Sequence, residues 1–304
     1  MSHRVRGRDR LMVAVAALAV LTVACGGATD EDPSAQPGAI RIAAFNFPES
    51  ELIAEIYAQA LEARGFPVER LGRIGSREVV QPALELGLID LVPEYAGTML
   101  SFVSLGDNEP TFDSWATMSE LREALEPRGM VVLEPANAQN QNSVIVMDGF
   151  ASEHDVWAVS DLTALADTLT FGGPRECPER PFCLIGLHDV YGLDFETFIP
   201  MPGSPIVADS LRAGEIDVGV MFSTDSALVD TDLIVLDDDL GLQPAENVVP
   251  VIRADALARW GAQVEDVLNE VSTRLDTSDL RLLNLRVEDP ASDIGALAEL
   301  WLAS

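Results

Sequence analysis

The 304-residue sequence contains no lysine and only three residues each of cysteine, tyrosine and histidine. Its 19 basic residues are therefore all arginine, and they are outnumbered by 50 acidic residues, which gives a net charge of −31 at pH 7. A negative charge of this size repels nucleic acid and anionic membrane surfaces, so neither is expected as a partner. The charge is typical of a solvated acidic surface.

Side chains for catalysis are sparse as well. His3 lies in the N-terminal segment, and His154 and His188 fall in expected loops without a serine or cysteine nucleophile in a recognisable setting. No glycine-rich phosphate loop is present in the sequence. The sequence therefore predicts a protein that is not an enzyme and that needs no cofactor or metal.

Two of the three cysteines, Cys177 and Cys183, lie in the segment Glu-Cys-Pro-Glu-Arg-Pro-Phe-Cys. Outside the cytoplasm, a close pair of this kind is typical of a disulfide that closes a small loop. Zinc binding together with His188 is an alternative, although two thiols and one imidazole are an incomplete ligand set. A disulfide is the favoured interpretation, ahead of a metal site and of two free thiols.

Only one long apolar run is found, and it lies at the N-terminus. After four arginines in the first ten residues, Leu11 to Ala24 is almost continuously apolar over about fourteen residues, too few to cross a membrane comfortably. Residues 1–24 are therefore predicted to be a signal peptide. Beyond them no second run of this length occurs, so the mature chain is expected outside the cytoplasm.

The residues around Cys25 resemble a bacterial lipobox, in which the cysteine becomes the lipidated first residue. Thr22 stands where leucine is usual, with Leu21 one place earlier. Residues 25–38 then predict a flexible, lipid-anchored tether on the outer face of the cell membrane. An ordinary secretory signal with an incidental cysteine is the alternative.

One pattern of residues occurs twice. Each copy predicts a helix that ends at a glycine, where the left-handed cap needs no Cβ atom, and then a β-branched strand that ends in an aromatic residue. Ligands of open α/β sheets bind beyond the carboxyl ends of strands, so the two copies predict two similar lobes around a small molecule. The matching residues are Leu84, Gly87, Ile89, Asp90 and Tyr95 in the first copy and Leu211, Gly214, Ile216, Asp217 and Phe222 in the second.

The alternation of strands and helices predicts an α/β protein with mostly parallel sheets. Strands are expected at residues 40–44, 68–71, 89–92, 143–147, 168–171, 195–199, 216–220, 233–236 and 248–252. Helices are expected at residues 49–64, 76–86, 161–167, 205–213, 255–274, 277–286 and 291–302. Residues 39–142 and 245–304 are assigned to lobe 1 and residues 143–244 to lobe 2, with a two-strand hinge near 141–145 and 240–248.

Several segments resemble one known family over nearly the whole mature chain. They are residues 42–49, 54–62, 75–80, 93–98, 190–193, 222–225 and 236–241. The resemblance is to ABC-transporter substrate-binding proteins of the glycine betaine/choline/carnitine group, of the OpuAC/ProX type. It implies a bilobal, type II periplasmic-binding-protein fold that closes on its ligand. It also implies a monomer, a membrane permease and an ATPase as partners, and no catalysis.

The resemblance also implies a ligand site. In the family a quaternary ammonium group sits in a box of tyrosines, whose negative ring faces attract the cation. Tyr95 matches one box position and Phe222 lies at or next to a second, but residues 140–143 and 247–250 lack the tyrosines that relatives often have. The predicted ligand-binding residues are Asn46, Tyr95, Thr98, Asn142, Phe222, Thr224 and Asp225.

The residues that hold a ligand carboxylate in this family are mostly replaced here. Phe45 stands at the place of a lysine and could instead add an aromatic wall, and Val207 stands at about the place of an arginine. Thr98 matches a hydroxyl that helps to hold the carboxylate. A buried carboxylate without a cation is costly, so the expected solute lacks one and is a choline-like cation or a neutral osmolyte. A lipoprotein sensor or scaffold of the same fold, with altered or lost solute binding, is the alternative.

Several of these residues also have structural interpretations. Thr98 and Thr224 are of a type that caps helices, and Asp225 fits the start of a helix equally well. Asn46 and Asn142 suit a turn and a hinge without any ligand. Asp90 and Asp217 are interpreted as structural residues that fix the start of a strand.

Overall fold

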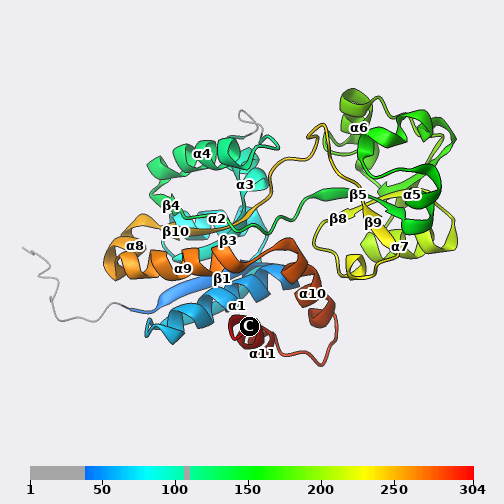
Figure 1. The fold of residues 1–304 in the computed structure, drawn as a ribbon. Helices are drawn as coiled ribbons and strands as arrows, with labels where there is room; N and C mark the ends of the chain where they lie inside the picture. Colours follow the sequence, from blue (N-terminus) through cyan, green and yellow to red (C-terminus); the bar gives the residue numbers. More distant parts are fainter. Residues whose placement is uncertain (1–37, 106–109) are drawn as a thin grey trace, which may run out of the picture. The chain divides into compact units, whose positions relative to one another are not determined.

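The computed structural model describes residues 38–105 and 110–304 (Figure 1). These residues form two five-stranded sheets, each with its own helices. The predicted signal peptide, the predicted lipidation site at Cys25 and the predicted tether as far as residue 37 lie outside the described residues. Among the helices of the described ranges, none has the length and apolar character required to cross a membrane.

The first sheet has the strand order β2-β1-β3-β10-β4. β1 runs parallel to β2 and β3, whereas β10 runs antiparallel to both β3 and β4. The strands are β1 (Ile40–Phe45), β2 (Val68–Gly75), β3 (Leu91–Tyr95), β4 (Met130–Val132) and β10 (Val248–Arg253). The accompanying helices are α1 (Pro48–Ala63), α2 (Arg77–Glu85), α3 (Ala96–Val103), α4 (Ser114–Leu125), α8 (Ala254–Trp260), α9 (Ala262–Arg274), α10 (Thr277–Val287) and α11 (Ile294–Leu302).

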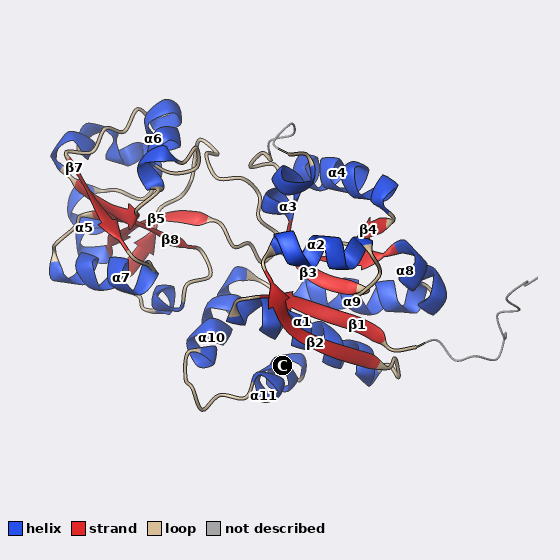
Figure 2. Ribbon diagram, turned by 180° about the vertical axis from the view of Figure 1, so that it is seen from behind, coloured by secondary structure: helices blue, strands red, loops and turns tan. Residues whose placement is uncertain are grey.

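The second sheet has the strand order β7-β6-β8-β5-β9, and Figure 2 shows helices against it. Its strands are β5 (Asn142–Met147), β6 (Thr170–Pro174), β7 (Thr197–Met201), β8 (Val218–Phe222) and β9 (Leu233–Val235). Its α-helices are α5 (Asp148–His154), α6 (Leu184–Tyr191) and α7 (Ser204–Ala213), and short 3₁₀ helices include η2 (Val159–Ala164), η3 (Ala166–Thr168), η4 (Cys177–Glu179) and η5 (Ser226–Val229). A disulfide joins Cys177 to Cys183, with the two Cα atoms 5.3 Å apart.

Two chain segments connect the sheets, one between β4 and β5 and one between β9 and β10. They pair through an isolated bridge between Gln139 and Asn247. The Gln139 carbonyl accepts a 2.7 Å hydrogen bond from the Ser223 hydroxyl, just after β8. The loop that follows β8 is therefore attached to one of these connecting segments.

The repeated aspartates perform the structural role predicted for them. Oδ2 of Asp90 accepts the Arg41 backbone N–H at 2.9 Å, and Oδ2 of Asp217 accepts the Thr170 backbone N–H at 2.8 Å. In both cases the donor lies on the neighbouring parallel strand or directly beside its start. The prediction is confirmed, because each aspartate fixes where two adjacent strands begin. Asp90 also binds the guanidinium of Arg41 through both oxygens, at 2.7 and 2.9 Å.

Two predicted helices differ from the structure. The helix expected at residues 161–167 is replaced by η2 and η3, in which Leu165 and Thr168 donate to carbonyls three residues back. The Thr163 and Thr168 hydroxyls also bond to carbonyls three residues back, which competes with an α-helical turn. The helix expected at residues 255–274 is broken into α8 and α9 at Gly261, whose φ is +83°.

Candidate functional site

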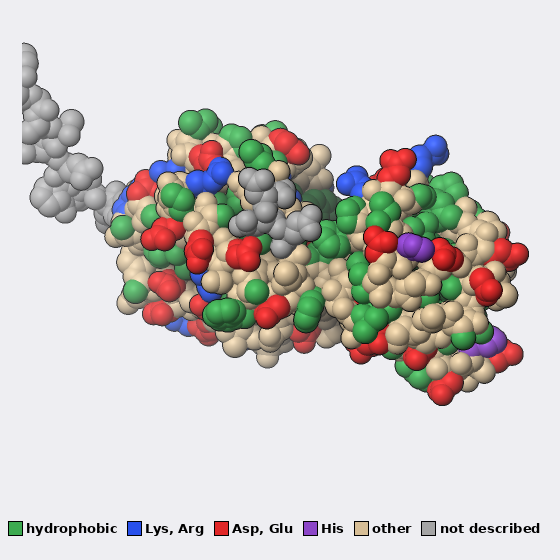
Figure 3. Space-filling view, turned by 90° about the horizontal axis from the view of Figure 1, so that it is seen from above, with side chains coloured by type: hydrophobic (Ala, Val, Ile, Leu, Met, Phe, Trp, Pro, Cys, Tyr) green, Lys and Arg blue, Asp and Glu red, His purple; other side chains and the backbone are tan. Residues whose placement is uncertain are grey.

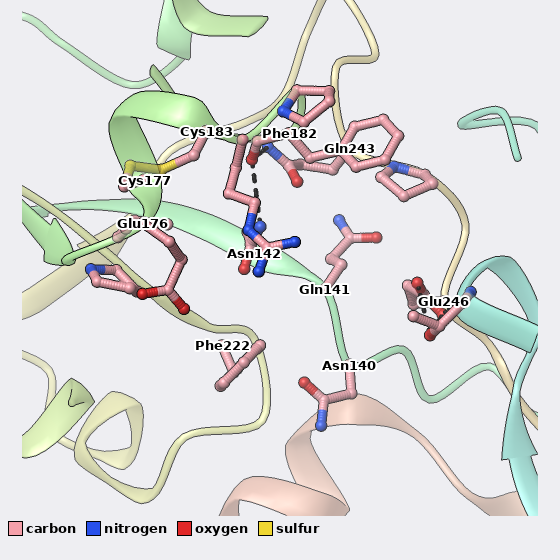
Figure 4. A pocket seen from close by; sticks show the side chains of 16 residues that line it. Asn140, Gln141, Asn142, Glu176, Cys177, Phe182, Cys183, Phe222, Gln243 and Glu246 are labelled. Atoms are coloured by element: carbon pink, nitrogen blue, oxygen red, sulfur yellow. Dashed lines mark hydrogen bonds between the residues drawn. A yellow bond between two sulfur atoms is a disulfide. The ribbon is translucent and has the colours of Figure 1, made fainter. Parts of the chain in front are cut away.

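Among the pockets of the described residues where the sheets are connected, two share a wall formed by Asn140 and Phe222. The first, here called the loop pocket, has a volume of about 450 Å³ and lies against the disulfide loop, residues 176–183 (Figure 4). The second, here called the α10 pocket, has a volume of about 410 Å³ and is formed by the start of α1, the loop after β8 and α10. Asn140 and Phe222 line both pockets, so a single small molecule can contact the two at once.

The predicted ligand residues are distributed unevenly over these pockets. Thr98 and Asn142 line the loop pocket, and Thr224 and Asp225 line the α10 pocket. Phe222 projects from the end of β8 into both, and 52% of it is exposed although it is an apolar ring. An aromatic ring left half exposed at a pocket can contact a ligand.

Two predicted ligand residues line neither pocket. Asn46 is exposed in the turn after β1. Tyr95 is only 6% exposed and lies behind the α10 pocket, where its hydroxyl donates a 2.7 Å hydrogen bond to Glu49. Its ring packs near Phe47, with centroids 5.9 Å apart. Tyr95 therefore supports two residues of the pocket wall rather than contributing its own ring face.

The α10 pocket combines aromatic rings with carboxylates. Phe47 and Phe222 supply the rings, and the carboxylates are those of Glu49, Asp225 and Glu288. None of the described residues that line it is basic. Negative charges and aromatic faces without a counter-charge are typical of a site for a cation.

Glu49 is the most deeply placed of these carboxylates, with 6% exposed. Besides the Tyr95 hydroxyl, it accepts the side-chain amides of Asn140 at 2.8 Å and Asn284 at 2.6 Å. Three neutral donors stabilise the carboxylate without cancelling its charge. The pocket therefore keeps a buried negative charge that a ligand can neutralise.

Asp225 is the second carboxylate and stands at the turn after β8. Its Oδ2 accepts the Phe222 backbone N–H at 2.7 Å, which fixes the backbone beneath the phenyl ring. Burial raises the pKa of Asp225, the negative charges of Glu49 and Glu288 raise it further, and hydrogen bonds to Ser204 and Phe222 oppose the shift. Repulsion among these three carboxylates is relieved when a cation binds.

In the loop pocket the main acidic group is Glu246, which is 8% exposed. Its carboxylate accepts the Thr98 backbone N–H at 3.1 Å and the Thr98 hydroxyl at 2.9 and 3.0 Å. Thr98 lies in the first turn of α3, where backbone N–H groups are free to bind anions. Burial raises the pKa of Glu246 to about 7, against the lowering effect of the Thr98 bonds and the Arg77 charge.

Two polar atoms of this region are buried and have no hydrogen-bond partner among residues 38–105 and 110–304: Oδ1 of Asn140 and Oε1 of Gln243. Both are acceptors, because the Asn140 amide nitrogen donates to Glu49 and that of Gln243 donates to the Phe182 carbonyl at 3.2 Å. Buried polar atoms almost always have partners, so these two acceptors indicate a place for a ligand's donor groups.

Phe45 and Val207, which replace the basic residues of the resemblance, are both buried and line neither pocket. Phe45 stacks against Phe47 with ring centroids 6.0 Å apart, and the Arg77 guanidinium lies 5.1 Å from the Phe45 centroid. Arg77 is itself paired with Glu94 at 2.8 Å. Phe45 therefore supports Phe47 from behind and adds no further wall to the pockets.

Sequence reasoning missed Glu49, Gln243, Glu246 and Asn284. A signal for Glu49 was present, because it stands in register with Leu52, Ile53 and Ile56 on the buried face of α1. A charged residue at such a position is rarely buried unless it is partnered or functional. The other three residues stand in loops or on a polar face and carry no comparable signal.

The comparisons with known proteins agree on one family. The family model for the substrate binding domain of ABC-type glycine betaine transport systems matches residues 38–304. The chain is 28% identical over 264 residues to the glycine-betaine-binding protein of Pseudomonas aeruginosa, covering 84% of each chain. It is 25% identical over 265 residues to the glycine betaine-binding protein YehZ of Escherichia coli, covering 84% of this chain and 86% of the relative.

Solved structures show the same fold. A glycine betaine/carnitine/choline ABC transporter structure matches with a TM-score of 0.80 at 23% identity, over 87% of this chain and 97% of that chain. Ligand-free YehZ matches with a TM-score of 0.77 at 22% identity, over 88% of this chain and 98% of that chain. The predicted bilobal substrate-binding-protein fold and the family resemblance are thus both confirmed.

Proposed function

This chain belongs to the family of substrate-binding domains of ABC-type glycine betaine transport systems, and we propose that it captures a small quaternary-ammonium or osmolyte-type solute for an importer. It acts outside the cytoplasm and delivers the solute to a membrane permease that an ATPase drives. We propose no catalytic activity for it. A lipid anchor at Cys25 and a monomeric state complete the proposal.

The composition of the α10 pocket is the observation that carries this proposal. Phe47 and Phe222 offer ring faces to a cation that cannot donate hydrogen bonds, and each such contact contributes about 0.5–2 kcal/mol. Glu49 and Asp225 add negative charge next to the rings. A trimethylammonium group satisfies both requirements, because it is apolar at its surface and positively charged.

The same pocket disfavours a ligand carboxylate. The charges of Glu49, Asp225 and Glu288 repel it, and neither Phe45 nor Val207 can replace a basic residue. Among solutes named for the relatives, choline has the cation without the carboxylate. We therefore propose that a choline-like cation binds more tightly than glycine betaine or carnitine.

We further propose that residues 39–142 with 245–304 and residues 143–244 are the two lobes, hinged at the connecting segments. Phe222 belongs to residues 143–244, Glu49 and Thr98 belong to the other lobe, and Asn142 lies at the boundary between the two, where β5 begins. A solute that contacts both lobes stabilises the closed arrangement, and that closed form is the one that a permease recognises.

Isothermal titration calorimetry of the full chain against choline, glycine betaine, carnitine and 3,3-dimethylbutanol tests the proposal. The last compound has the shape of choline without its charge, so weaker binding of it isolates the contribution of the cation. The F222A variant is expected to bind choline about 3- to 30-fold more weakly, because it loses a cation–π contact. W115A is the matched control, because Trp115 is exposed on α4 and lines neither pocket.

Tight binding of glycine betaine with weak binding of choline would contradict the proposed preference. Binding of no solute at all would instead favour the sensor or scaffold alternative. Equal losses in F222A and W115A would show that the affinity loss does not report a contact in these pockets.

A further inference from the structure

One carboxylate of the chain itself occupies the group of donors best suited to a ligand anion. Glu246 accepts both the backbone N–H and the hydroxyl of Thr98, at distances of 2.9 to 3.1 Å. The start of an α-helix attracts anions through its unpaired N–H groups and its dipole. The nearby cation Arg77 is engaged as well, because it pairs with Glu94 at 2.8 Å.

The fit between Glu246 and α3 is close. A Cβ atom at Gly97, the residue before Thr98, would lie 2.9 Å from the Ala245 carbonyl oxygen and 3.1 Å from Oε1 of Glu246. Glycine therefore leaves the space in which the carboxylate reaches the helix. The backbone N–H of Glu246 is also bound, donating to Oε1 of Gln139 at 3.1 Å. Main chain and side chain together keep this carboxylate at the helix start.

A second, independent observation concerns the wall beside Glu246 (Figure 4). Gln243 is 7% exposed, and its Oε1 has no hydrogen-bond partner among the described residues. Oδ1 of Asn140 is likewise buried and unpartnered. Both atoms belong to residues that line the loop pocket, so this pocket presents acceptors that need donors. Arg180, on the disulfide loop, is the basic residue among the described residues that line it, and it is exposed.

We propose that Glu246 is a specificity-determining residue whose carboxyl group takes the place of a ligand carboxylate at the start of α3, so that the site selects solutes without a carboxylate and with a hydrogen-bond donor at the end opposite the cation. This inference rests on the proposed function. The cationic end lies in the α10 pocket, and the donor end faces Asn140, Gln243 and Glu246 in the loop pocket. The hydroxyl of choline meets this requirement.

A ligand carboxylate is expected to bind the wild type weakly, and a substitution at Glu246 is expected to restore its binding. It has no donor for Asn140 and Gln243, and it finds Thr98 already bound to Glu246. Removal of the Glu246 side chain frees the Thr98 N–H and hydroxyl and opens a space next to them. The variant E246A is therefore expected to accept a ligand carboxylate where the wild type does not.

Calorimetric titration of wild type and variants with choline and with glycine betaine tests this inference. In the wild type, choline is expected to bind at least tenfold more tightly than betaine. In E246A, betaine affinity is expected to rise at least tenfold. In E246A/T98V this gain is expected to be smaller, because the donor hydroxyl is gone and only the backbone N–H of residue 98 remains. E246Q keeps the side-chain volume and offers an amide donor, so it is expected to gain at least threefold in betaine affinity.

The matched control is E176A. Glu176 also lines the loop pocket but is exposed and makes no bond to α3, so its removal deletes one negative charge without freeing Thr98. The inference predicts no comparable betaine gain in E176A. An equal gain in E176A and E246A would overturn it, because net charge alone would then explain the change.

The outcomes separate this inference from the proposed function. A wild type that binds neither choline nor betaine contradicts the proposed function itself. A wild type that binds choline, with betaine affinity unchanged in E246A and E246Q, leaves the proposed function intact and overturns the role of Glu246. If E246A fails to fold, E246Q alone decides, because it preserves the shape of the side chain.

Discussion

Glu246 should also make the stability of the protein depend on pH in a way that needs no solute to observe. Burial raises the pKa of its carboxyl from 4.5 to about 7, and the Thr98 hydrogen bonds and Arg77 reduce the shift while Glu94 increases it. Between these two values the folded protein holds a proton that the unfolded chain has lost. The contribution to the unfolding free energy is therefore fully present below pH 4.5 and is lost as the pH rises through 7.

The size of the effect follows from the interval between the two pKa values. Each pH unit corresponds to about 1.4 kcal/mol, so the interval from 4.5 to about 7 corresponds to about 3 kcal/mol at most. The variant E246Q cannot titrate at this position, yet its side-chain oxygen can still accept a bond from Thr98. Relative to the wild type, E246Q should therefore gain about 3 kcal/mol between pH 4.5 and pH 8.

The assay is urea unfolding of the wild type and E246Q at several pH values from 4.5 to 8, because other titrating groups cancel in the difference. E123Q serves as the control, since Glu123 is exposed on α4. Its difference from the wild type should stay flat over this range. Parallel pH profiles of wild type and E246Q would refute the reasoning, because they would show that Glu246 does not retain its proton in the folded protein.

Two further predictions concern the fold. D90A should lower the unfolding free energy by about 2–3 kcal/mol, because the Asp90 side chain is buried and binds a guanidinium as well as a backbone N–H. D217A should lower it by about 1 kcal/mol, because Asp217 is half-buried and accepts one backbone N–H from the neighbouring strand. Urea unfolding checks the order, and a larger loss in D217A would contradict it. C177S should lower the unfolding free energy of the oxidised protein by about 2 kcal/mol, because it removes the Cys177–Cys183 disulfide. Dithiothreitol should remove this difference between C177S and the wild type. A difference that dithiothreitol leaves unchanged would contradict the disulfide.

The starts of β3 and β8 could be predicted because local patterns determine them, whereas the prediction of mostly parallel sheets was wrong, because β5 and β10 each pair antiparallel with both of their neighbours. The repeated glycine and aspartate of residues 84–95 and 211–222 mark where a helix ends and a parallel strand begins, and Asp90 and Asp217 fix those starts in the structure. The break at Gly261 was missed because the apolar spacing continues through it. A glycine between Trp260 and Ala262 was the available signal, since its left-handed conformation interrupts helical hydrogen bonding.

The site was harder to predict because its contacts join distant parts of the chain. Glu49 binds Tyr95, Asn140 and Asn284, and no local pattern brings four such segments together. Tyr95 was expected to face the solute, and the structure instead turns its hydroxyl toward Glu49. The resemblance to a family locates the region of the site, but the orientation of a buried ring depends on its tertiary neighbours.

The loop after β8 is attached on two sides. Ser223 bonds to Gln139 on the connecting segment, and on the opposite side Arg281 of α10 donates to the Ser223 carbonyl at 2.6 Å while Asn284 donates to that of Thr224 at 2.9 Å. Residues 222–225 are thus also a link between the second sheet and α10, a helix that accompanies the first sheet. A rotation that moves this loop away from α10 has to break both hydrogen bonds, so these two contacts oppose any opening of the α10 pocket by such a movement.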